Sequence, residues 1–410
     1  MTQPSPLQNS PGRIRKLLGF LGLRRSMAAM LAMAVLVGMG ENLAERFLPV
    51  YLMALGGGAL AVSTLNGMDN LLSALYSYPG GYLSDRLGYK KALLVFNLIA
   101  MAGYLVVILI PAWWAVILGA VLFLSWSAIS LPATMSLVAA VLPERKRTMG
   151  VSMHSLVRRI PMALGPVIGG ALIAWKGEVL GIRYAFVAAL FLALIALFLQ
   201  QRFVEDRRSG AKAEGSPLKL FSRMSPSFRI LLAADILVRF SEQIPYAFMA
   251  IWVVKNHGLS PVSFGLLTTI EMVTAMLVYI PVAYLADRGS KKPFVAITFG
   301  FFTLFPLVFM LADSFWMFAI AFVIRGLKEF GEPTRKALIM DLAPEGQKAG
   351  MFGLYYLLRD VVVSLAAFSA GFLWNISPQA NFLTAFAFGL AGTLFFILYG
   401  TDVSRKIAAG

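Results

Sequence analysis

The segment SDRLGYKK at residues 84–91 returns, one residue shorter, as ADRGSKK at residues 286–292. Each copy lies between two long apolar runs. The copies are separated by about half of the 410 residues in the chain. Such a recurrence predicts two similar halves, each built from apolar segments that are joined by short charged loops.

Other residues recur in the same order along the chain. With an offset of 201 or 202 positions, the pairs are Glu41 with Glu242, Asp69 with Glu271, Asp85 with Asp287, Pro132 with Pro333, and Arg158 with Arg359. Parallel repeats of this kind are related by an axis along the membrane normal, and they place a binding site between the halves near the bilayer midplane.

The composition indicates a membrane protein. Hydrophobic residues make up 59% of the chain and charged residues only 14%, whereas soluble domains have about 25% charged residues. Twelve apolar runs are each long enough to cross a bilayer as a helix. They cover residues 27–54, 60–83, 91–110, 114–142, 149–175, 183–201, 228–254, 261–285, 293–311, 315–340, 350–374 and 380–400. The predicted fold is therefore all-α, with twelve transmembrane helices in two six-helix bundles.

The basic residues predict the orientation of these helices. The net charge is +16, and most Lys and Arg residues lie at the N-terminus, in every second loop, including 335–348, and in the tail. The opposite loops hold only Lys176, Arg183 and Lys255. By the positive-inside rule both termini are cytoplasmic, and we expect a bacterial inner membrane. The basic charge is thus attributed to topology, and no nucleic-acid partner is expected.

One long polar stretch divides the chain. Residues 204–225 are rich in Ser, Gly and mixed charges, as is typical of a linker. The predicted domains are a first bundle at 1–203, a cytoplasmic linker at 204–225 and a second bundle at 226–410.

The first copy of the repeated loop resembles the signature loop of the major facilitator superfamily. The matching residues are Gly81, Asp85, Arg86, Gly88, Lys90 and Lys91, and the shorter second copy retains Asp287 and Arg288. The resemblance implies a twelve-helix secondary transporter in which this loop is similar to a latch on the cytoplasmic side. The alternative is a loop that only fixes topology through its positive charge.

A second motif is similar to the helix-5 signature of drug/proton antiporters. It comprises Gly165, Pro166, Gly169 and Gly170, although Ser152 and Pro161 stand where that pattern has glycine. An arginine that the family carries in helix 4 is missing. The resemblance implies proton-coupled efflux, whereas the alternative is a tight helix crossing with no bearing on direction.

Carboxylates within apolar spans are candidates for proton coupling, because ionisable groups are costly at membrane depth. Glu41 and Asp69 are the first candidates, followed by Glu242 and Glu271. Glu41, Asp69 and Glu271 have no obvious basic neighbour in the sequence, and a carboxyl without a cationic partner in apolar surroundings exchanges protons more readily near neutral pH. The alternative is a carboxylate that meets a cationic substrate without proton exchange.

Basic residues within the spans are candidates for substrate binding or gating. The guanidinium groups of Arg158, Arg159 and Arg359 suit an anionic substrate group, or they pair with Glu332 and Asp360 as gates. The full candidate set is Arg158, Arg159, Arg239, Arg325, Glu329, Glu332, Arg359 and Asp360. On helix 7, Arg239 is three or four residues from Asp235 and Glu242, and a purely structural pairing there is an alternative.

Enzymatic and cofactor functions find little support. The chain has no cysteine, and its two histidines, His154 and His257, are too far apart for a histidine metal site. No nucleotide-binding loop or catalytic cluster is present, so we expect neither an enzyme nor a cofactor. We predict a monomer that exports a small organic molecule in exchange for protons. Alternatives are proton-coupled import of an anionic or zwitterionic solute and transport of a lipid-like substrate.

Overall fold

The computed structural model describes residues 25–87, 89–124, 144–203, 221–286, 290–344 and 348–401, and its regular secondary structure is helical throughout these ranges. The elements of the first half are α2 (Arg25–Ala44), η1 (Glu45–Phe47), α3 (Leu48–Ala54), α4 (Gly58–Leu87), α5 (Tyr89–Leu109), α6 (Trp113–Phe123) and α8 (Glu144–Phe203). Those of the second half are α10 (Pro226–Tyr246), α11 (Met249–Ile251), η2 (Trp252–Asn256), α12 (Pro261–Ala286), α13 (Lys292–Leu311), α14 (Phe315–Leu327), α15 (Glu332–Leu342), α16 (Lys348–Ile376) and α17 (Pro378–Tyr399).

The helix order is consistent with twelve spans. Among the residues that the structure describes, six helices are long and apolar enough to cross a membrane by themselves. They lie within α5, α8, α12, α13, α16 and α17. Helix α8 is formed by two arms, because Gly177 interrupts its helical backbone at φ 80°, a conformation that favours glycine. Residues 149–175 and 183–201 thus form two successive segments, as the hydropathy predicts.

Two helix starts show how the sequence sets boundaries. Ser225 and Ser377 precede α10 and α17, and their side chains accept hydrogen bonds from the amides of Phe228 and Ala380 at 3.2 and 3.0 Å. Proline is the next residue in both cases, where its missing N–H costs no intrahelical bond. Each helix is therefore capped at the residue where its apolar run begins.

In the described part of the chain, three predicted spans are not continuous helices. The first, 27–54, changes to a 3₁₀ turn at Glu45–Phe47, because Pro49 has no N–H for the Glu45 carbonyl and its ring crowds that group. The span at 228–254 contains a turn after Tyr246 and a π-helical segment, Trp252–Asn256. The span at 315–340 turns between α14 and α15. Hydropathy cannot show such breaks, since the residues within them remain largely apolar.

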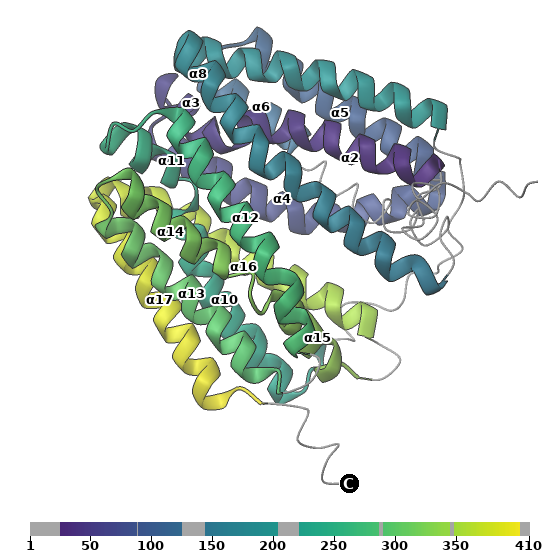
Figure 1. Ribbon diagram of the computed structural model, residues 1–410, viewed down its shortest axis with the longest axis vertical. Coiled ribbons are helices and arrows are strands. Elements are labelled where there is room, and N and C mark those ends of the chain that lie inside the picture. The colour runs from purple at the N-terminus through teal and green to yellow at the C-terminus, as the bar shows by residue number, and fades with distance from the viewer. Residues whose placement is uncertain are drawn as a thin grey trace, which may run out of the picture.

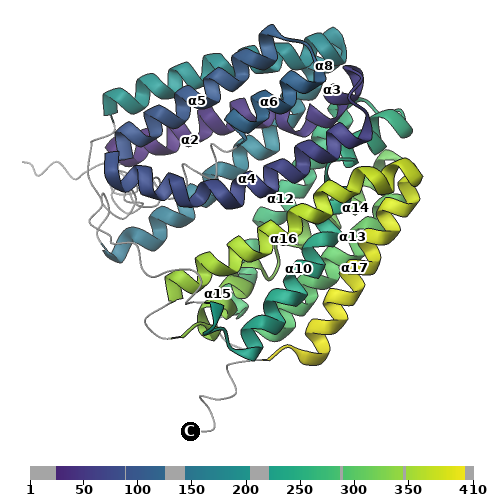
Figure 2. The ribbon, with the colours of Figure 1, turned by 180° about the vertical axis from the view of Figure 1, so that it is seen from behind.

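The helices form two groups that meet along crossing helices (Figures 1 and 2). Helices α2 to α8 lie on one side and α10 to α17 on the other, while α4 contacts α16 and α8 contacts α12 between them. Backbones approach closely at these crossings: a Cβ atom on Gly170 of α8 would lie 2.5 Å from the Pro261 carbonyl oxygen of α12. A Cβ atom on Gly265 of α12 would lie equally close to the Pro166 oxygen of α8.

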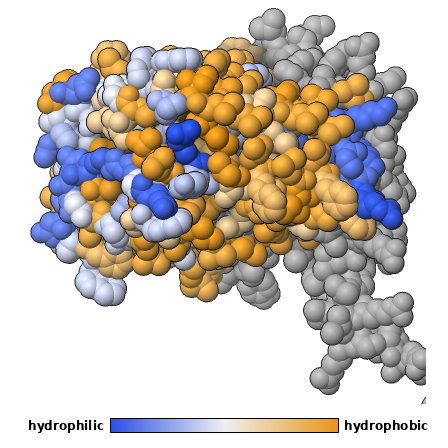
Figure 3. Space-filling view, turned by 90° about the horizontal axis from the view of Figure 1, so that it is seen from above, coloured by the Kyte–Doolittle hydropathy of each residue, from blue (hydrophilic) through white to orange (hydrophobic). Residues whose placement is uncertain are grey.

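The surface matches an apolar solvent. Figure 3 shows a broad hydrophobic area between hydrophilic ends on one face of the molecule. Large apolar side chains such as Trp316, Phe198 and Leu398 are more than two-thirds exposed. Exposure on this scale is unfavourable in water, and hydrocarbon removes the cost.

Candidate functional site

A cavity lies where the breaks in the first helix of each half meet. It has an empty volume of about 490 Å³, which includes space open to solvent. The 3₁₀ turn contributes Glu45 and Arg46, the last residue of α10 contributes Tyr246, and the turn that follows contributes Ala247. Asn66 and Asp69 of α4 and Phe264 of α12 complete the part of the wall that carries polar or aromatic groups. Both halves of the chain therefore line one space.

Two opposite charges face this cavity without an ion pair. Asp69 forms no hydrogen bond or ion pair with any described residue, and the ionisable group that most influences it is another carboxyl, Glu45. Arg46 lies over the Tyr246 ring at 5.2 Å, and its Nε atom is buried without a hydrogen-bond partner. Asp69 and Arg46 are therefore charged groups of the wall without an ion pair to a described residue, and Glu45 of the same wall likewise forms none with the described residues.

The neighbouring carboxylates of the second half are already paired. Arg325 donates from Nε to Glu271 at 2.8 Å, and both side chains are almost fully buried. Lys328 lies 2.5 Å from Glu242 and 3.7 Å from Glu271. Arg325 also lies over the Tyr246 ring at 5.3 Å, so this pair lies directly behind the cavity wall.

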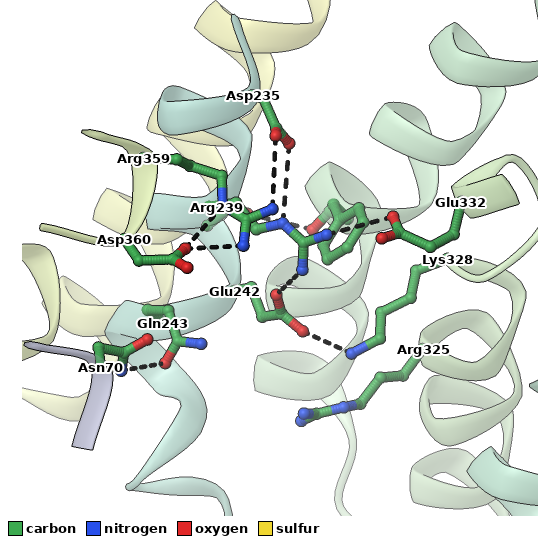
Figure 4. A network of polar contacts seen from close by, with 12 residues as sticks. Asn70, Asp235, Arg239, Glu242, Gln243, Arg325, Lys328, Glu332, Arg359 and Asp360 are labelled. Atoms are coloured by element: carbon green, nitrogen blue, oxygen red, sulfur yellow. Dashed lines mark hydrogen bonds and ion pairs between the residues drawn. The ribbon is translucent and has the colours of Figure 1, made fainter. Parts of the chain in front are cut away.

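Figure 4 shows that Arg239 connects several of these groups. Its guanidinium donates to Glu242 at 2.6 Å and to Glu332 at 3.2 Å, and it lies 3.7 Å from Asp235. Helices α10, α14 and α15 are thereby joined by a network of alternating charges. Such a network stays buried at tolerable cost only when each charge has partners.

The deepest part of the network is the pair of Asp235 and Arg335. Both side chains are 0% exposed, and Arg335 donates to the Asp235 carboxylate. Tyr355 donates its hydroxyl to the same carboxylate at 2.8 Å. Arg359 lies 3.7 Å from Asp235 and pairs with Asp360 at 2.7 Å. Helices α10, α15 and α16 are therefore held together by one buried carboxylate.

Polar contacts also cross between the halves. Arg159 of α8 pairs with Glu329 at 2.9 Å, in the turn between α14 and α15. Lys255 pairs with Glu178 at 2.5 Å near the opposite ends of the helices. Asn70 of α4 donates to the Gln243 side chain of α10 at 3.2 Å (Figure 4).

The four predicted proton-coupling residues lie in different settings. Asp69 lines the cavity, whereas Glu41 lies on α2 within electrostatic range of Tyr104 and is not part of the cavity wall. Glu242 and Glu271 belong to the ion-pair network. Glu271 has no basic neighbour in the sequence, but the fold supplies cationic partners for it: Arg325 of α14 and Lys328 directly after that helix.

The predicted substrate or gating residues are mostly brought together. Arg239, Arg325, Glu332, Arg359 and Asp360 belong to the network described above. Arg159 and Glu329 form the pair between the halves. Arg158 lies within electrostatic range of Glu45 at the cavity wall. Their roles in binding or gating stay predictions.

The predicted latch is only partly visible. Gly88, Asp287 and Arg288 lie outside the described residues, as do the side chains of Asp85 and Arg86 and the surroundings of Gly81. Lys90 donates to the Gln201 carbonyl oxygen at 2.6 Å, and Lys91 is exposed.

The helix-5 motif lies at two helix crossings. Gly165 and Gly169 face α2 at Asn42 and Leu43, where a Cβ atom would overlap the backbone. Gly170 and Pro166 face α12, as described above. The motif thus packs α8 against α2 of its own half and against α12 of the other half.

Arg335 lies where the predicted span 315–340 overlaps the predicted cytoplasmic loop 335–348. The structure decides for the span, because Arg335 is fully buried in α15. Its spacing of three residues from Glu332, within the first turn after Gly331, is a signal for an internal pair. Tyr246 was also missed, although Pro245 marks the helix break that places it at the cavity.

Comparisons with known proteins agree with this architecture. The profile of the Major Facilitator Superfamily matches residues 30–240 and again residues 231–409. An uncharacterised MFS-type transporter of Methanocaldococcus jannaschii is 25% identical over 395 residues, covering 90% of each chain. The quinolone resistance protein NorA of Staphylococcus aureus is 26% identical over 157 residues, which are 38% of this chain and 40% of NorA.

Solved structures share the fold at low sequence identity. A POT family transporter in complex with a thioalcohol-conjugated peptide has a TM-score of 0.78 at 14% identity, covering 93% of this chain and 96% of its own. The nucleoside transporter NupG has a TM-score of 0.78 at 12% identity, with coverage of 91% and 99%. Together with the family profile across both halves, these matches show that the chain belongs to the Major Facilitator Superfamily of membrane transporters.

Proposed function

We propose that the protein is a proton-coupled secondary transporter that exports a small organic solute by alternating access. The observation that carries the proposal is the position of Asp69, which lines the cavity between the halves without an ion pair among the described residues. A carboxyl group that is accessible from such a cavity and lacks a cation is suited to bind and release a proton during each cycle.

Two features support the export direction. The Gly165–Gly170 motif is similar to the helix-5 pattern of drug/proton antiporters, and part of the chain is similar to the quinolone resistance protein NorA. The basic loops support a bacterial cytoplasmic membrane with both termini inside the cell. In this arrangement a solute enters the cavity from the cytoplasm and displaces the proton on Asp69.

Proton-coupled import of an anionic or zwitterionic solute is the second candidate. Arg46 favours it, because this cation faces the cavity without an ion pair to a described carboxylate. Two structural neighbours, the POT family transporter and NupG, are named for peptides and nucleosides. At 14% and 12% identity these neighbours share the fold with this chain.

Everted vesicles with an acidic interior test the proposal. A pH-sensitive dye reports proton loss from the vesicles while candidate solutes are added. We expect solute-triggered proton loss with the wild type and with Asp313→Asn, which changes an exposed carboxylate away from the cavity. Asp69→Asn should give none.

Two results would contradict parts of this proposal. Full proton exchange by Asp69→Asn would remove Asp69 from the coupling role. Solute accumulation that requires protons to move in the same direction as the solute would establish import.

A further inference from the structure

The cavity wall carries one cation, Arg46, and two carboxyl groups, those of Glu45 and Asp69. Arg46 and Asp69 line the same cavity, yet they form no ion pair together or with other described residues. The Arg46 Nε atom is buried and has no hydrogen-bond partner. A buried donor of this kind is unfavourable until something accepts its hydrogen bond.

The other charges nearby are compensated within the protein. Glu242 and Glu271 are engaged by Lys328, Arg239 and Arg325 through direct ion pairs. Glu45 lies under the electrostatic influence of two cations, Arg46 and Arg158. Asp69 differs, since the ionisable neighbour that acts on it most is the carboxyl of Glu45. Asp69 is therefore the carboxylate of the wall that most needs a cation, and Arg46 is the cation that lacks a direct anion.

The remaining wall suits an apolar body. It is formed mainly by Leu48, Val62, Leu65, Leu124, Met249 and Phe264. The Tyr246 ring lies 5.2 Å from the Arg46 Cζ atom, within the range of a cation–π contact. A guanidinium group presents paired donors to a carboxylate.

We propose that the solute is a small zwitterion, with an ammonium group that binds Asp69, a carboxylate that binds Arg46, and an apolar body between the two. The inference rests on the proposed function, in which this cavity is the transport site. A purely cationic solute leaves Arg46 without an anion in direct contact, and a purely anionic solute leaves Asp69 without a cation in direct contact. Each incomplete match forfeits a charge-assisted contact in apolar surroundings. In the exchange proposed above, the ammonium group takes the place of the proton on Asp69.

Equilibrium binding to the purified full-length protein in lipid nanodiscs tests this assignment. The probes are three matched sets built on leucine, phenylalanine and leucyl-phenylalanine. Each set comprises the zwitterion, its methyl ester, which is only cationic, and its N-acetyl derivative, which is only anionic. Calorimetry should show at least one zwitterion binding about tenfold or more tighter than both of its derivatives.

The variants assign each end of the ligand. Arg46→Gln should remove the preference over the ester, and Asp69→Asn should remove the preference over the N-acetyl form. Arg229→Gln and Asp313→Asn, which change exposed residues of the same types away from the cavity, should keep both preferences.

Three results overturn the proposal: no zwitterion binds, a singly charged derivative binds as tightly as its zwitterion, or Arg46→Gln weakens the ester and the zwitterion equally. Binding at equilibrium requires no proton gradient and no direction of transport. A failure of proton coupling in the vesicles therefore leaves this test intact, and a failure here leaves the vesicle result intact.

Discussion

Asp235 and Arg335 show what a single residue contributes in this protein. Their charges are fully buried, and the carboxylate also accepts the Tyr355 hydroxyl bond. Removing one member of such a pair leaves the other charge buried without compensation. The loss in the free energy of unfolding is larger than for a surface ion pair, because water replaces the missing partner at the surface.

We therefore predict that Asp235→Asn destabilises the protein by about 3–5 kcal/mol. Asp341→Asn is the matched control, because Asp341 forms an exposed ion pair with Lys291, and such pairs are worth about 0–1 kcal/mol. Thermal unfolding in detergent, followed by intrinsic fluorescence, measures both. Equal midpoints for the two variants would show that the buried pair is not a stabilising contact.

At the scale of the element, the break in the first helix matters most. Pro49 removes one helical hydrogen bond at Glu45, and the resulting 3₁₀ turn places Glu45 and Arg46 in the cavity wall. In the second half, Pro245 precedes the turn that brings Tyr246 and Ala247 to the same wall. Irregular backbone at membrane depth is tolerated where it lines a cavity.

Pro49→Ala supplies the missing donor, so we predict a continuous helix through Glu45–Phe47 and an Arg46 side chain that is displaced from the cavity. Solute binding should weaken on the order of tenfold or more, while the unfolding temperature stays the same or rises. Pro306→Ala, within α13 and away from the cavity wall, should change binding little. A loss of binding accompanied by lower stability in Pro49→Ala would contradict this explanation.

The sequence predicted elements better than it predicted contacts. Apolar length located the spans, and an isolated carboxylate within a span pointed to Asp69, which lines the cavity and whose role stays a prediction. The partners of Glu271 could not be found in this way, because Arg325 lies 54 residues further along the chain. Arg335 was counted with a loop because a charged residue near the end of a span is usually exposed to water. Here the ion pair with Asp235 of α10 compensates the charge, so the side chain is buried without contact with water. Such pairings depend on how helices pack, which local patterns do not encode.

At the scale of the whole molecule, the halves meet through backbone contacts that leave no room for a side chain. Gly170 lies against Pro261, and Gly265 lies against Pro166, so α8 and α12 can approach at both points. Thr269 of α12 adds a hydrogen bond to the Ala163 carbonyl oxygen of α8 at 2.6 Å. Alternating access requires the two halves to separate at the end where α8 and α12 cross, while they close at the opposite end.

Gly170→Ala and Gly265→Ala each insert a methyl group 2.5 Å from a carbonyl oxygen of the other half. We predict that both variants disfavour the arrangement seen here and shift the population toward separation of α8 and α12. Spin labels measure the shift, and the chain offers a clean background because it has no cysteine. One labelled pair is Leu60→Cys with Ile376→Cys, at the end where the halves meet, and the other is Lys91→Cys with Lys336→Cys, at the opposite end; all four residues are exposed. The first distance should lengthen and the second should shorten.

Gly300→Ala is the control, since a Cβ atom there meets no heavy atom within 4 Å. If the glycine variants lose folded protein but keep both distance distributions, the contact stabilises the fold without controlling access, and the halves must separate at another surface.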